Sequence, residues 1–110
     1  KWSGGIFLGY EVPADAVELT GTENLSRYTS SAWAERAFCK TCGSNMFYRV
    51  TAPGPHEGVY HFGFGTLDEV GDIPLTGELF IDLKPSGYSF AGKTHQMATE
   101  EVLAMFAPTD

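Results

Sequence analysis

The stretch AFCKTCGSNMFY, residues 37–48, holds both cysteines of the chain and decides how its central region folds. Cys39 and Cys42 are separated by two residues, and Gly43 follows them directly. A glycine at this position suits a tight turn, because it adopts a left-handed backbone without steric cost. Beyond the turn, residues 45–50 (NMFYRV) alternate in side-chain character with a period of two, which predicts a strand. The sequence therefore predicts two thiols at a turn that precedes a strand.

Two thiols at this spacing are compatible with a metal site, a redox pair, a small disulfide or two reduced thiols. The thiols of a redox pair are normally activated at the N-terminus of a helix. A strand is predicted after Cys42 instead, which argues against a redox-active pair. A zinc knuckle places such a pair in a turn between strands, so the spacing favours a metal site over plain thiols. A structural zinc needs four ligands, and the chain has no second cysteine pair. The other local candidates are the carboxylates and three histidines, none of them paired at ligand spacing: His56, His61 and His95.

The segments around this stretch predict a mainly β fold. Strand-like runs rich in aromatic and branched residues, each bounded by turn residues, occur at residues 5–12, 23–31, 59–65 and 78–85. Residues 13–19 favour one helical turn, because proline fixes the backbone angle at its entry. Short strands separated by glycine- and proline-containing loops predict packed antiparallel sheets in a single domain over residues 1–110.

One C-terminal helix is predicted over residues 98–107 (ATEEVLAMFA). Thr99 is the expected N-cap, and the two glutamates that follow it suit the positive end of the helix dipole. An apolar stripe on this helix, most simply a contact with the core, consists of Val102, Leu103 and Phe106.

Composition limits the classes of partner. The chain has 110 residues, of which 43% are hydrophobic, enough for one core. Fourteen acidic residues against seven basic ones give a net charge of −7, which repels nucleic-acid backbones and anionic lipid. No apolar stretch is long enough to span a bilayer, and two cysteines do not make a secreted disulfide scaffold. We therefore expect no nucleic-acid or membrane partner, and a cytoplasmic location.

The run ERAFCKTCGSNMFY, residues 35–48, resembles the zinc motif of the glutathione-dependent formaldehyde-activating enzyme family, which includes centromere protein V. The residues that match the motif one by one are Arg36, Phe38, Cys39, Cys42, Gly43 and Ser44. Three further segments are similar to family motifs and follow in the family's order: KWSGGIF (1–7), FGFGTLD (62–68) and ELFIDLKPSGY (78–88). The resemblance covers nearly all of the chain up to Tyr88.

The resemblance implies a fold of the β-tent type and a structural zinc held by four cysteines. It also implies a second, labile zinc at which glutathione and formaldehyde form S-hydroxymethylglutathione, the reaction of a zinc-dependent carbon–sulfur lyase. Within this resemblance, Cys39 and Cys42 are structural metal ligands, and a small thiol substrate is bordered by the residues after the labile-zinc loop. Those expected substrate-binding residues are Trp2, Ser3, Gly4 and Gly5.

The chain departs from the family pattern in its cysteines. The family's other structural ligands and its labile site precede the segment that matches Lys1, so no catalytic residue is assigned here. We expect an upstream cysteine-rich segment to be missing, or a second copy in a homodimer to complete the site. The chain by itself is then expected to be inactive. The alternative is a non-catalytic zinc-knuckle β module that binds a peptide or a thiol.

Overall fold

The structure is a computed structural model that describes residues 2–106. These residues form two compact units, which divide between Val70 and Gly71. Each unit is described by itself, so the expectation of a single domain over residues 1–110 stays a prediction. No helix in the described residues is long and apolar enough to cross a membrane.

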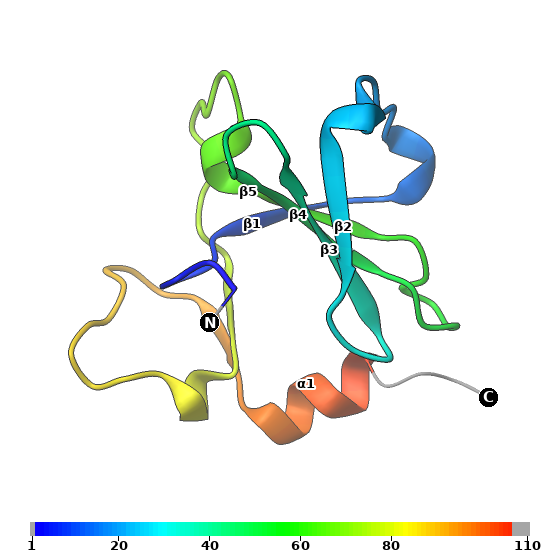
Figure 1. Ribbon diagram of the computed structural model, residues 1–110. Helices are drawn as coiled ribbons and strands as arrows, with labels where there is room; N and C mark the ends of the chain where they lie inside the picture. Colours follow the sequence, from blue (N-terminus) through cyan, green and yellow to red (C-terminus); the bar gives the residue numbers. More distant parts are fainter. Residues whose placement is uncertain (1, 107–110) are drawn as a thin grey trace. The chain divides into compact units, whose positions relative to one another are not determined.

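The first unit is built on one antiparallel sheet of five strands (Figure 1). The order across the sheet is β1-β5-β4-β3-β2, so neighbouring strands in the middle are also neighbours in sequence. The strands are β1 (Gly9–Val12), β2 (Leu25–Thr29), β3 (Ala34–Cys39), β4 (Asn45–Val50) and β5 (Tyr60–Gly63). The 3-10 helices of this unit are η1 (Ala14–Ala16), η2 (Thr22–Asn24) and η3 (Phe64–Thr66). A mainly β fold with antiparallel pairing is therefore confirmed.

The core of the sheet centres on Phe47 of β4. Its ring lies 4.9 Å from that of Tyr60 and 5.5 Å from that of Phe62, measured between ring centroids. The other buried apolar residues of this unit are small or branched: Ala34, Ala37, Val50 and Ala52. Phe47 and Val50 differ by an odd number of positions and thus face opposite sides, so both faces of β4 are buried in places.

The strands predicted at residues 5–12, 23–31, 59–65 and 78–85 are all shorter in the structure than the sequence suggested. β1 begins only at Gly9, where a side chain would come within 2.8 Å of the ring of Phe7. The strand predicted over residues 78–85 ends at Leu79, because Phe80 adopts a left-handed backbone with φ 58°. Such a conformation interrupts an extended strand.

The second unit contains β6 (Gly77–Leu79), η4 (Ile81–Leu83), β7 (His95–Met97) and α1 (Thr99–Phe106). β6 and β7 pair in parallel, and the sequence did not predict β7. The C-terminal helix is confirmed.

The expected N-cap of α1 is wrong by one position. The carbonyl of Ala98 accepts the first bond of the helix, from the backbone N–H of Val102 at 3.0 Å, so Ala98 is the N-cap. Asp82 supplies the capping oxygen, which accepts hydrogen bonds from the backbone N–H of Thr99 at 2.7 Å and from its hydroxyl at 3.1 Å. These hydrogen bonds lower the pKa of Asp82. Because Asp82 is distant in sequence, local capping rules do not identify it.

Candidate functional site

The two thiols lie on a tight turn between β3 and β4. Cys39 ends β3, and its carbonyl accepts a hydrogen bond from the N–H of Gly43 at 2.8 Å. The N–H of Cys39 in turn donates to the carbonyl of Ser44 at 2.9 Å. Gly43 has φ 78°, the left-handed conformation that the sequence predicts for it. Both cysteines are free, so the disulfide alternative is not observed.

Cys42 is the more accessible of the two thiols. Its side chain is exposed, whereas that of Cys39 is half-buried. The Sγ of Cys42 lies 3.1 Å from the hydroxyl of Ser44. Hydrogen bonds from the side chain and backbone of Ser44, and from Cys39, lower the pKa of the Cys42 thiol. The turn therefore favours a thiolate, the form in which cysteine binds a metal.

The donor set of the turn fits part of a zinc site. Two thiolates in a knuckle between strands match two corners of a tetrahedral centre. Within residues 2–106, no three groups from histidine, cysteine, aspartate and glutamate lie together in a way that could hold a metal ion. Neither the histidines nor the carboxylates of the described chain therefore complete the site around Cys39 and Cys42.

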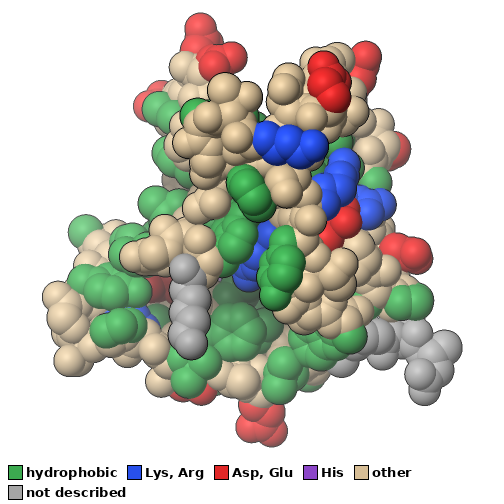
Figure 2. All heavy atoms as spheres, in the orientation of Figure 1, with side chains coloured by type: hydrophobic (Ala, Val, Ile, Leu, Met, Phe, Trp, Pro, Cys, Tyr) green, Lys and Arg blue, Asp and Glu red, His purple; other side chains and the backbone are tan. Residues whose placement is uncertain are grey.

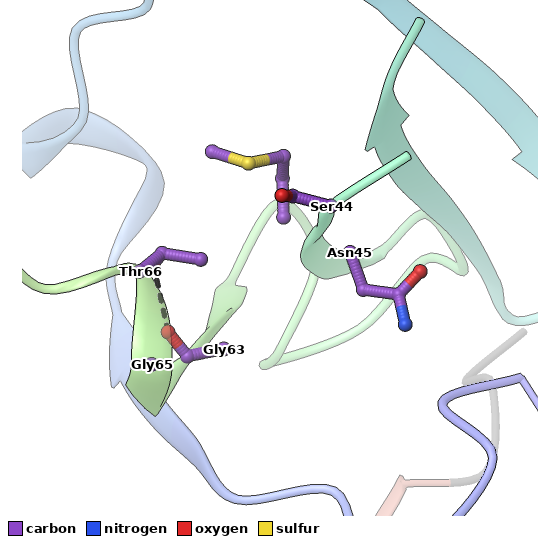
Figure 3. A pocket seen from close by; sticks show the side chains of 6 residues that line it. Ser44, Asn45, Gly63, Gly65 and Thr66 are labelled. Atoms are coloured by element: carbon purple, nitrogen blue, oxygen red, sulfur yellow. Dashed lines mark hydrogen bonds between the residues drawn. The ribbon is translucent and has the colours of Figure 1, made fainter. Parts of the chain in front are cut away.

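Two cavities flank the thiol turn. The larger, about 430 Å³, opens beside Ser44, and Figure 3 shows Thr66 donating to the carbonyl of Gly63 within its wall. Its lining residues are Ser44, Asn45, Met46, Gly63, Gly65 and Thr66. The smaller, about 220 Å³, is more apolar and includes Cys39, Phe47 and Phe62 in its wall. Cys39 therefore lines the apolar cavity, whereas the thiol turn reaches the glycine- and hydroxyl-lined cavity through Ser44 and neither cysteine lines it.

A second group of chemically active side chains crosses the middle of the sheet. The register aligns one residue from each strand in order from β2 to β1, and we call this set the cross-strand row: Tyr28, Arg36, Tyr48, His61 and Glu11. Directly opposed residues in antiparallel strands share a face, so the row forms a line on one side of the sheet. The rings of Tyr48 and His61 are 5.7 Å apart.

Arg36 is held between two aromatic rings. Its guanidinium carbon lies 4.8 Å from the ring centroid of Trp2 and 4.8 Å from that of Tyr48. Both distances fall within the range of cation–π attraction. Burial lowers the pKa of Arg36, and the electrostatic interaction with Tyr48 opposes that shift. Arginine nevertheless keeps its charge at neutral pH.

The contact between Trp2 and Arg36 positions the expected substrate-binding segment, residues 2–5. Trp2 packs on Arg36 and lies 6.0 Å from the ring of Phe7. The hydroxyl of Ser3 donates to the carbonyl of Gly5 at 2.9 Å, and Gly4 has φ 72°. These residues do not line either of the two cavities. Their substrate-binding role therefore stays a prediction.

Burial of His61 predicts a pH-dependent stability. Burial lowers the pKa of His61 below its ordinary value of 6.5, with Glu11 opposing the shift and His56 adding to it. The unfolded chain then binds a proton on His61 more readily than the folded chain does. The free energy of unfolding is therefore highest above the pKa that His61 has in the unfolded chain, and it declines as the pH falls through that value. We expect the free energy of unfolding in urea to fall between about pH 7 and about pH 5, and to fall less in His61→Gln.

The matched control for this prediction is His95→Gln, since the side chain of His95 is exposed. An equal pH dependence in the wild type and in His61→Gln would contradict the assignment.

Sequence reasoning found the thiols and considered His61 only as a candidate metal ligand, and it missed Tyr48 as a member of a site. Ser44 belonged to the matching zinc motif. Arg36 was part of a matching motif, yet nothing local indicates that Trp2 covers it. The available signal was the alternation of residues 45–50, which assigns Tyr48 to a face. The alternation does not give the register that aligns Tyr48 with Arg36 and His61.

Comparison with known proteins agrees with the motifs. The family model described as glutathione-dependent formaldehyde-activating enzyme matches residues 2–82. An uncharacterized lyase of Schizosaccharomyces pombe is 28% identical over 102 residues, which are 93% of this chain and 72% of that protein. No solved structure matches the chain significantly. With a matched region that extends from Trp2 through the thiol turn and beyond the cross-strand row, the chain belongs to the glutathione-dependent formaldehyde-activating enzyme family.

Proposed function

We propose that the protein acts as a zinc-dependent carbon–sulfur lyase that forms S-hydroxymethylglutathione from glutathione and formaldehyde. The observation that carries the proposal is the thiol turn, because it presents two free cysteine side chains within the matched region of the family. The relative from Schizosaccharomyces pombe is named a lyase, which supports the same class of reaction. We further propose a cytoplasmic location.

In this reaction the sulfur of glutathione forms a bond to the carbon of formaldehyde. The π electrons of the carbonyl move to its oxygen, and that oxygen takes up the proton that the thiol releases. A bound labile zinc, distinct from the structural one, would supply Lewis-acid chemistry that stabilises a thiolate or polarises a carbonyl. Cys39 and Cys42 would hold a structural zinc, not act as nucleophiles.

The remaining ligands of that zinc would come from outside residues 2–106. The chain has only two cysteines, so a four-thiolate site needs two more sulfurs. They would be supplied by other residues of the gene product or by a second copy of this chain. In the second case the protein would be a homodimer with the metal between its subunits.

The test compares this 110-residue chain with the protein isolated from the cells that make it. Formation of S-hydroxymethylglutathione is followed by NMR, with equal zinc added to each sample. We expect the isolated protein to accelerate the reaction and the 110-residue chain to leave the uncatalysed rate unchanged, because two thiolates hold zinc weakly. Acceleration by the chain alone would show that the site needs no further ligand.

A non-catalytic binding module is the second candidate. The observation in its favour is the absence of a third metal ligand beside the thiols within residues 2–106. If neither preparation accelerates the reaction and both bind glutathione, the module is the better description.

A further inference from the structure

Arg36 differs from the other two arginines in its charge environment. Arg27 and Arg49 share the carboxylate of Glu35, at distances of 2.7 Å and 3.5 Å. Figure 2 shows basic side chains beside an acidic one over the region of β2. Glu35 and Arg36 are adjacent on β3 and therefore face opposite sides of the sheet. Among residues 2–106, Arg36 takes part in no ion pair and no side-chain hydrogen bond.

Arg36 therefore lacks an acidic partner among residues 2–106, although the chain has a net charge of −7. A half-buried guanidinium without an acidic partner gives up hydration, and stacking on two rings replaces only part of it. The N–H groups of the guanidinium have no hydrogen-bond acceptor among residues 2–106. An anionic ligand group would supply the missing acceptors.

The neighbours of Arg36 in the cross-strand row suit such a ligand. Tyr48 has a hydroxyl that donates hydrogen bonds, and His61 is next to it. Burial raises the pKa of Tyr48 and lowers that of His61, so both are uncharged at neutral pH. The acidic member of the row, Glu11, lies at its far end on β1, three strands away from Arg36. The region around Arg36 is therefore positive and rich in donors.

We propose that Arg36, in cation–π contact with Trp2 and Tyr48, binds a carboxylate group of a small peptide ligand. This inference rests on the proposed function, in which that ligand is glutathione, a tripeptide with two carboxylates. The planar fork of a guanidinium matches a carboxylate with two parallel hydrogen bonds. The two rings fix the fork before the ligand arrives, which reduces the conformational entropy lost on binding. Trp2 then contributes to substrate binding through Arg36.

The experiment measures binding of glutathione and of its diethyl ester by isothermal titration calorimetry. The ester keeps the thiol and the peptide backbone but lacks both carboxylates. The proteins are the wild-type chain, Arg36→Gln, Arg36→Lys and the control Arg27→Gln. The control removes one positive charge from the opposite face. Thermal unfolding of each variant confirms that it is folded.

We expect the wild type and Arg27→Gln to prefer glutathione over the ester by about ten- to hundredfold. Arg36→Gln should bind both compounds equally, and Arg36→Lys should keep only part of the preference, since an ammonium lacks the planar fork. An undiminished preference in Arg36→Gln, or no preference in the wild type, would overturn the inference and leave the proposed lyase function intact. No glutathione binding by the wild-type chain would also overturn the inference, whereas the proposed lyase function is tested separately, by turnover with the isolated protein.

Discussion

Phe47→Ala is expected to remove most of the stability of the first unit. Phe47 is 1% exposed, and it is the largest fully buried side chain of the described residues. Truncation of a buried phenylalanine costs about 3 to 5 kcal/mol, from lost transfer free energy and the cavity left behind. Small domains are stable by only about 5 to 15 kcal/mol, so the variant should be largely unfolded at low denaturant. Urea unfolding followed by circular dichroism measures the change.

The sheet has few residues to compensate for this loss. The other buried apolar side chains of the unit are alanines and one valine, which offer little surface to repack. The matched control is Tyr28→Ala on the opposite face of the sheet, since Tyr28 is 61% exposed. It should cost less than about 1 kcal/mol. Equal losses in the two variants would show that Phe47 is not the centre of the core.

Cys42→Ser is expected to weaken zinc binding by about a hundredfold or more. Four-ligand structural zinc sites bind with about 10 to 16 kcal/mol, which is roughly 2.5 to 4 kcal/mol for each ligand. A serine hydroxyl stays protonated at neutral pH and does not replace a thiolate. Competition with a chromophoric zinc chelator, carried out on the isolated protein, measures the affinity. Cys39→Ser should give a loss of similar size.

Thr41→Ser is the control for the zinc prediction. Thr41 lies between the cysteines, is exposed, and offers no metal-binding group of comparable softness. It should leave the affinity for zinc unchanged. Wild-type affinity in Cys42→Ser would show that the turn is not a metal site, and the two thiols would then be plain or redox-active cysteines.

Most of the strand positions were predictable because their signals are local. Residues 45–50 alternate with period two, and the structure forms β4 over the same residues. The errors occur where a distant contact decides the conformation. Phe80 leaves the extended conformation although its neighbours in sequence favour a strand. Asp82 caps a helix that begins 17 residues later, which no rule on neighbouring residues detects.

The thiol turn was predictable from local sequence, because the spacing of Cys39 and Cys42 and the glycine after them act within one short segment. The family was predictable too, through motifs that follow one another in a fixed order. The row that contains Arg36, Tyr48 and His61, and the contact of Trp2 with the arginine, became visible in the folded sheet alone. Strand register sets those contacts, and register depends on the packing of the whole sheet, not on any one strand.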